Sequence, residues 1–150
     1  MISKLIENEE LLSDLYEQYS NMLPDDSEFW MQIAKDETVH ASWVTELSEK
    51  VKQGLVQVDD SRFKDPAIEN FGRWLLENIQ KAKSEVISPI QALSISMDLE
   101  NSMLERGIFE AYDSDDPELR TVLEKLKKST EIHYAEVKAR WNEERSSSST

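Results

Sequence analysis

Carboxylates and imidazoles at helical spacing are the residues of this sequence whose types could carry chemistry. The chain has two histidines and no cysteine, so a bound metal would have oxygen and nitrogen ligands alone. Glu37 and His40 are three residues apart, which places them on one side of a helix. They can then bind one ion together while the second carboxylate oxygen reaches another ion. Such ligands suit iron or manganese, and zinc remains an alternative.

Glu9, Glu100 and His133 are the other polar side chains expected to point inward, because each lies within the apolar face of its own helix. The apolar neighbours are Leu5, Leu12, Tyr16, Tyr19 and Leu23 around Glu9; Trp30, Ile33, Ala41, Val44 and Leu47 around Glu37 and His40; Leu93, Met97, Leu104 and Ala111 around Glu100; and Leu119, Val122, Leu126, Val137 and Trp141 around His133. Taken singly, such a Glu usually reaches back to water and such a His is usually a hydrogen-bonded core residue. Together they favour a shared cation, because buried carboxylates must be neutralised.

Proline marks the starts of the helices that must position these side chains. Pro66, Pro89 and Pro117 each follow a residue that can cap a helix, Asp65, Ser88 and Asp116, and Pro24 precedes the capping candidates Asp25, Asp26 and Ser27. We expect helices at 3–22, 26–53, 66–83, 89–112 and 117–144, with Gly54 ending the second. The predicted fold is all-α, a four-helix bundle with a long crossover that carries the extra helix 66–83. Residues 1–145 would form one domain and 146–150 a disordered tail.

Charge and composition exclude several classes of partner. The 150 residues include 17 Lys and Arg against 31 Asp and Glu, a net charge of -14. This charge opposes binding to nucleic acid and to anionic membranes. No segment is long and apolar enough to span a bilayer, and the first residues do not resemble a secretory signal. We therefore expect a cytoplasmic protein that binds neither nucleic acid nor membranes.

Four segments together resemble the ferritin-like superfamily, and within it the rubrerythrin-type di-iron carboxylate proteins. They are EELLSDLYEQY at 9–19, FWMQIAKDETVH at 29–40, ALSISMDLENSMLE at 92–105 and LKKSTEIH at 126–133. The resemblance implies that Glu9 and Glu100 are terminal ligands, that Glu37 bridges two ions, and that His40 and His133 each bind one. It also implies that Tyr16 lies beside the first ligand, and that iron reacts with oxygen or peroxide in a peroxidase or ferroxidase type of oxidoreductase.

Thr130 is the main departure from that family. It stands three residues before His133, where the family has the Glu of a second Glu-x-x-His, so the second bridging carboxylate is missing. Two ferrous ions would bring four positive charges against three carboxylates, and we expect the second ion to bind more weakly. The chain also lacks the cysteines of a rubredoxin-like module, which excludes an internal electron donor of that kind.

Two functional hypotheses follow from these residues. In the first, Glu9, Glu37, His40, Glu100 and His133 hold one or two iron ions, with Tyr16 and Thr130 beside them. In the second, the same residues form a buried polar network in a metal-free structural or interaction domain, which Thr130 favours. We also expect a homodimer, because four tryptophans exceed the needs of one narrow core, and Trp74 is the candidate contact.

Overall fold

The computed structural model describes residues 2–57, 66–105 and 116–148. These residues form the helices α1 (Ile2–Met22), η1 (Pro24–Asp26, a 3-10 helix), α2 (Ser27–Lys52), α3 (Pro66–Ser84), α4 (Pro89–Glu105) and α5 (Pro117–Ser148). The described part of the chain contains no strand, which confirms the predicted all-α fold class. In the same ranges, no helix combines the length and the apolar character needed to cross a membrane.

The helix ends agree with the sequence prediction at most positions. The helices α3, α4 and α5 begin at the three expected prolines. The end of the expected helix 89–112, including Ala111, lies outside the described residues. α5 continues to Ser148, so residues 146–148 are helical although their composition predicted disorder. Serine is only slightly less favourable in a helix than most residues, and three of them are too few to end one.

Local hydrogen bonds explain several of these boundaries. The Asp116 carboxylate accepts from the backbone N–H of Glu118 at 2.9 Å and so caps α5. Ser88 and Gln91 exchange side chain to backbone hydrogen bonds of 2.9 and 3.3 Å at the start of α4, which is a capping box. Gly54, with φ of 75°, follows the end of α2 as predicted. Asp26, one of the three candidates after Pro24, occupies the N-cap position of α2, but its side chain makes no cap hydrogen bond and lies 3.7 Å from Arg140.

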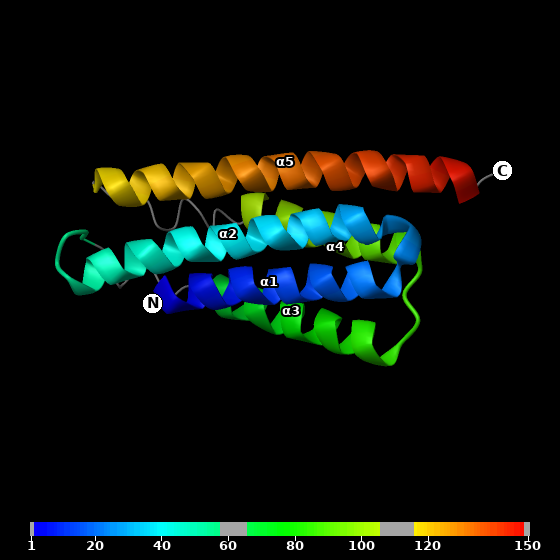
Figure 1. Ribbon diagram of the computed structural model, residues 1–150, viewed down its shortest axis with the longest axis horizontal. Coiled ribbons are helices and arrows are strands. Elements are labelled where there is room, and N and C mark those ends of the chain that lie inside the picture. Colours follow the sequence, from blue (N-terminus) through cyan, green and yellow to red (C-terminus); the bar gives the residue numbers. More distant parts are fainter. Residues whose placement is uncertain (1, 58–65, 106–115, 149–150) are drawn as a thin grey trace.

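Successive helices run in opposite directions, as the colours in Figure 1 show. α1 packs along α2, to which the short turn η1 connects it, and α4 packs along α5. α2 and α4 run the same way, so the chain must travel back along the molecule between them. α3 makes this return against α1, while α5 contacts α2 on the opposite side of the molecule (Figure 1).

A glycine lies at the contact between α1 and α3. A Cβ atom at Gly72 would lie 2.8 Å from Oδ1 of Asn8, closer than real Cβ contacts allow, so a larger residue there would require the Asn8 side chain to shift. The Asn8 amide donates to the carbonyl of Ile68 at 3.2 Å. Phe71 and Leu75 on the same face of α3 are buried in the core. α3 is thus held on the outside of α1.

Aromatic side chains fill the core between α1 and α2. Trp30 is fully buried, and its ring lies 5.5 Å from that of Tyr16 and 5.1 Å from that of Tyr19. The other tryptophans, Trp43, Trp74 and Trp141, are only partly buried at the edge of the core. The aromatic cluster therefore fixes α1 against α2 close to Glu9 and Glu37, which come from these two helices.

Candidate metal centre

Four helices direct polar side chains into the same buried region. Glu9 comes from α1, Glu37 and His40 from α2, Glu100 from α4 and His133 from α5, and none of the five is more than 2% exposed. α3 contributes no residue to this set. Five ionisable side chains at such depth need partners or a bound ion, because an isolated buried charge is strongly unfavourable.

The five side chains form two groups that share Glu37. Glu9, Glu37 and His40 make the first triad, and Glu37, Glu100 and His133 the second; in each, one ligand atom per residue lies within 4.8 Å of the others. Nδ1 of His40 is 3.1 Å from Oε2 of Glu37, whereas Nδ1 of His133 is 2.8 Å from Oε1. The two oxygens of one carboxylate therefore face two different imidazoles.

The terminal carboxylates complete each triad at slightly longer distances. Oε2 of Glu9 is 3.6 Å from Nδ1 of His40, and Oε1 of Glu100 is 3.8 Å from Nδ1 of His133. Two ligand atoms that are each about 2.1 Å from one ion lie about 3.0 Å apart at a right angle and about 4.2 Å apart when opposite. All four measured separations are below that upper limit and near or above the right-angle value, so the histidine–carboxylate pairs of each triad are spaced as ligands of one ion would be.

Unsatisfied atoms point to the same interpretation. Among the described residues, Oε2 of Glu9, Oε1 of Glu37, Oε2 of Glu100 and Nδ1 of His133 are buried without a hydrogen bond. His133 Nδ1 and Glu37 Oε1 are close, but they are not aligned for a hydrogen bond. Buried polar atoms in folded proteins nearly always have a partner. A cation site contains ligand atoms that have no partner until the ion binds. The four unsatisfied atoms lie together in this way, so these residues fit a metal.

The outer nitrogens of both histidines have partners that hold the rings. Nε2 of His133 donates to Oδ2 of Asp36 at 3.0 Å, and Nε2 of His40 is hydrogen-bonded to Oγ of Ser129 at 2.6 Å. Each partner lies four residues before the other histidine, so the two helices anchor one another crosswise. With Nε2 engaged in this way, Nδ1 of each ring faces the carboxylates, as a metal ligand requires.

Sequence reasoning missed Asp36 and Ser129. The available signal was a polar residue one helical turn before each histidine, at the spacing that shares a helix face. That signal gives no pairing, because which anchor meets which histidine depends on how α2 and α5 are aligned.

Tyr16 and Thr130 lie beside the triads in different roles. The Tyr16 hydroxyl donates to Oε1 of Glu100 at 2.7 Å and accepts from Ser96 at 3.0 Å, so it contacts Glu100, although the family resemblance associates it with Glu9. Thr130 is 1% exposed, and its hydroxyl donates to the carbonyl of Leu126 in its own helix at 2.8 Å. Thr130 therefore adds no negative charge to the site.

Burial and the shared carboxylate set the pKa values of the three glutamates. Burial raises the pKa of Glu9 well above its usual value, and the adjacent Glu37 raises it further. Burial, followed by the charge of Glu37, raises the pKa of Glu100 to about 8. Burial acts in the same direction on Glu37, but its interactions with Glu9, His133 and His40 outweigh it and hold the pKa of Glu37 well below its usual range.

The imidazoles respond to the same carboxylates. Burial lowers the pKa of both rings, but contacts with Glu37 and Glu9 raise the pKa of His40 to about 10. Contacts with Glu37, Glu100 and Asp36 raise the pKa of His133 to about 9. Near neutral pH and without metal, these shifts favour two imidazolium ions beside an ionised Glu37 and a proton on Glu100, and they move Glu9 toward its protonated form. Protons then occupy the positions that a metal would take.

Comparisons with known proteins add no further constraint. No protein-family model matches the chain, and neither the curated proteins nor the solved structures give a significant match.

Proposed function

We propose that this chain is a ferritin-like metalloprotein whose buried triads bind one or two iron ions, with manganese or zinc as competing ions. The observation that carries the proposal is the division of the two Glu37 oxygens between His40 and His133, since a bridging carboxylate needs that arrangement. α2 and α4 run in the same direction, and α3 carries the chain back along the outside of α1, which supports a four-helix bundle with a long crossover.

The protein's own residues would hold the ions and neutralise their charge. Bound iron would supply the redox chemistry of an oxidoreductase acting with oxygen or peroxide. Glu37 would neutralise part of the charge of both ions, and, once the ions displace the Nδ1 protons, the hydrogen bonds at Nε2 would hold the remaining ring protons of His40 and His133 there. Tyr16 holds Oε1 of Glu100 by a hydrogen bond and leaves Oε2 available.

Charge balance limits how the second ion binds. Glu9, Glu37 and Glu100 together supply three negative charges against the four positive charges of two divalent ions. The position of a fourth carboxylate is taken by Thr130, which is neutral and bonded to its own helix. We therefore propose that the first ion binds tightly and the second weakly.

Metal titration under argon tests the proposal. Calorimetry with ferrous, manganous and zinc ions would give the stoichiometry, and mixing the iron-loaded protein with oxygen or peroxide would reveal oxidation as an absorbance change. Glu9→Gln should weaken binding, whereas Glu10→Gln, one residue along and exposed, should leave it unchanged. If the parent takes up less than 0.1 ion per chain, roughly the level of a contaminant, the metal function is wrong.

The competing candidate is a metal-free structural domain with the same buried network. The hydrogen bond between His40 and Glu37 and that between His133 and Asp36 favour it, because they neutralise part of the site without an ion. In that case the parent would bind no ion, and replacement of both histidines by glutamine would be the change that most alters folding.

A homodimer through α3 is a further part of this proposal. Trp74 packs edge-on against Phe71 and remains partly exposed, and Leu76 on the same helix is 54% exposed. Light scattering should give twice the monomer mass, and Trp74→Ser should reduce it toward the monomer value. A parent that remains monomeric at high concentration contradicts the dimer.

A further inference from the structure

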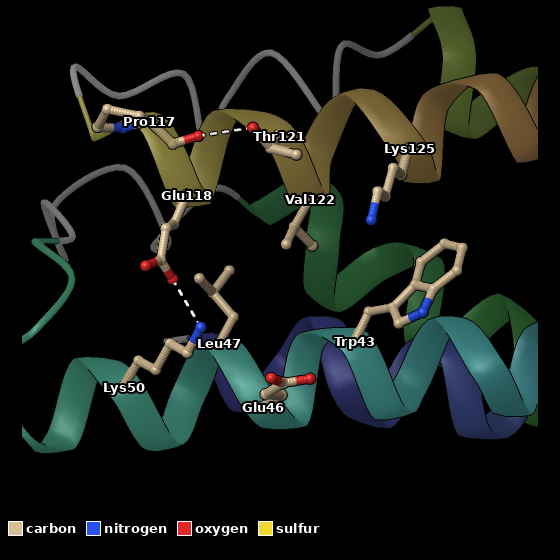
Figure 2. Close-up of a pocket in the computed structure, with 9 residues that line it drawn as sticks. All are labelled: Trp43, Glu46, Leu47, Lys50, Pro117, Glu118, Thr121, Val122 and Lys125. Carbon is tan, nitrogen blue, oxygen red and sulfur yellow. Dashed lines mark hydrogen bonds and ion pairs between the residues drawn. The ribbon is translucent and has the colours of Figure 1, made fainter.

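A cavity separate from the buried triads lies between α2 and α5 (Figure 2). Its volume is about 370 Å³, at the lower end of the range for small-molecule sites. Leu47 and Val122 point toward one another from the two helices and form its apolar part. Trp43 and Lys125 lie at one end, and Lys50 and Glu118 at the other (Figure 2).

Trp43 forms an aromatic wall of the cavity and contacts residues of both helices. One side packs against the ring of His40, whose centroid is 5.2 Å away at an interplanar angle of 32°. The Nζ atom of Lys125 lies over the Trp43 ring, 5.6 Å from its centroid. The Trp43 ring thus contacts a residue of the buried triads and also lines the cavity, where it offers a surface for stacking.

The charges that line the cavity are unequally engaged. Lys50 and Glu118 form an ion pair of 2.9 Å and largely cancel one another. Glu46 is exposed to solvent on α2. The contact of Lys125 with the Trp43 ring is an exposed cation–π interaction, which is worth only about 0.5–1 kcal/mol, so its flexible ammonium can move to a stronger partner.

We propose that this cavity binds a small planar aromatic carboxylate. The aromatic ring would stack on Trp43, Leu47 and Val122 would cover its apolar edge, and the Lys125 ammonium would leave the indole to pair with the carboxylate. Stacked aromatic pairs and charge-assisted contacts are the interactions that such a mixed lining can offer. The site goes beyond the metal function and does not depend on it, because none of the cavity's lining residues belongs to the triads.

Calorimetry with 2-naphthoate as the probe tests the proposal, using the full chain both metal-free and after iron loading under argon. Naphthoate should bind with a stoichiometry of one per chain in both states. Cyclohexanecarboxylate, which has no aromatic ring, and 2-naphthylmethylamine, which has the opposite charge, should each bind more weakly. Equal binding of the amine, or no detectable binding of naphthoate at millimolar concentration, overturns the proposal.

Variants locate the binding in this cavity. Lys125→Gln should lower the affinity for naphthoate about threefold to fivefold, as expected for the loss of a partly exposed ion pair. Trp43→Leu should weaken it about fivefold to tenfold, and Trp43→Phe, which keeps a ring and the fold, should lose less. Lys128→Gln, an exposed lysine elsewhere on α5, is the matched control and should bind like the parent. If Lys125→Gln and both Trp43 variants bind like the parent, the site is elsewhere and the proposal is wrong.

Discussion

The two triads of the buried centre are built on one plan but are not equivalent. Both use Glu37, one further glutamate, and the Nδ1 atom of a histidine. In the triad with His133, the outer nitrogen meets the carboxylate of Asp36, and Tyr16 donates to Glu100. In the triad with His40, the outer nitrogen meets the neutral hydroxyl of Ser129, while Oε2 of Glu9, like Oε2 of Glu100, has no hydrogen bond among the described residues.

If the site binds metal as proposed, this difference predicts which half binds the first ion. A carboxylate on the outer nitrogen orients a ligating imidazole and adds negative charge beside a bound ion, whereas a neutral hydroxyl adds no charge. The triad of Glu37, Glu100 and His133 is therefore the stronger half, and the triad with Glu9 and His40 the weaker one. The side chain of Asp36 is also 39% exposed, so a hydrogen bond links His133 to the surface.

Glu37→Gln should have the largest effect because it damages both halves at once. The variant loses the one triad carboxylate whose pKa is lowered, and the two imidazoles lose the partner that they share. Breaking a buried ion pair costs about 3–5 kcal/mol, and we expect a loss of that order in the free energy of unfolding without metal. Metal affinity should fall by more than about 100-fold, the upper end of the effect of an outer partner.

Denaturant unfolding and metal titration of Glu37→Gln measure these two effects. Glu46→Gln, an exposed glutamate on the same helix, is the control and should change neither. Retention of one tightly bound ion by Glu37→Gln would show that the carboxylate does not bridge.

Thr130→Glu tests the missing carboxylate. The change restores a second Glu-x-x-His, so iron should rise from about one ion toward two per chain. Without metal the extra buried carboxylate should destabilise the fold, because burial of an unpaired charge is unfavourable. Thr130→Gln, of the same size and uncharged, should destabilise without any gain in iron. Melting curves with and without ferrous ion, beside a metal count, separate the outcomes; iron that stabilises the Glu and Gln variants equally contradicts the role of charge.

Asp36→Asn and Ser129→Ala test the inequality of the halves directly. Loss of an outer partner reduces metal affinity about 10-fold to 100-fold, and we expect Asp36→Asn to approach the larger value for the first ion. Ser129→Ala should weaken the second ion and leave the first nearly unchanged. Sequential calorimetric titration resolves the two steps. The assignment of the stronger half is wrong if Ser129→Ala affects the first ion more than Asp36→Asn does.

The smallest effects concern protons. Because the pKa of His133 is about 9 and that of His40 about 10, both above the usual histidine value, the metal-free fold should be most favoured when both rings are protonated and should lose stability as the pH rises from about 7 to 10. The pKa of Glu100 is raised to about 8, so its deprotonation also destabilises the fold as the pH rises from the usual glutamate pKa to about 8. Glu37, whose pKa is lowered, weakens the fold only as the pH falls below its usual range.

NMR titration and unfolding at several pH values check this behaviour. His133 should lose its proton before His40. Metal binding near neutral pH should release up to four protons, one each from Glu9, Glu100, His40 and His133, which calorimetry in buffers of different ionisation enthalpy counts. A metal-free protein that gains stability between pH 7 and 10 would contradict the protonated histidines.

The sequence by itself determined which side chains lie inside. Helical periodicity placed Glu9, Glu37, His40, Glu100 and His133 among apolar neighbours, and all five are buried. Proline and its capping neighbours located the helix starts at Pro66, Pro89 and Pro117. These features are local: the pattern of one helix and the chemistry of its first turn are written within a few residues.

Only the tertiary structure decided how these side chains meet. The pairing of Asp36 with His133, the contact of Tyr16 with Glu100 and the packing of Trp43 against His40 each depend on the alignment of one helix along another, or on a rotamer. The packing of α3 on α1 through Gly72 likewise depends on close contact between distant segments. Periodicity fixes the direction of a side chain around its own helix axis. The relative height and rotation of the helices come from packing their apolar faces together.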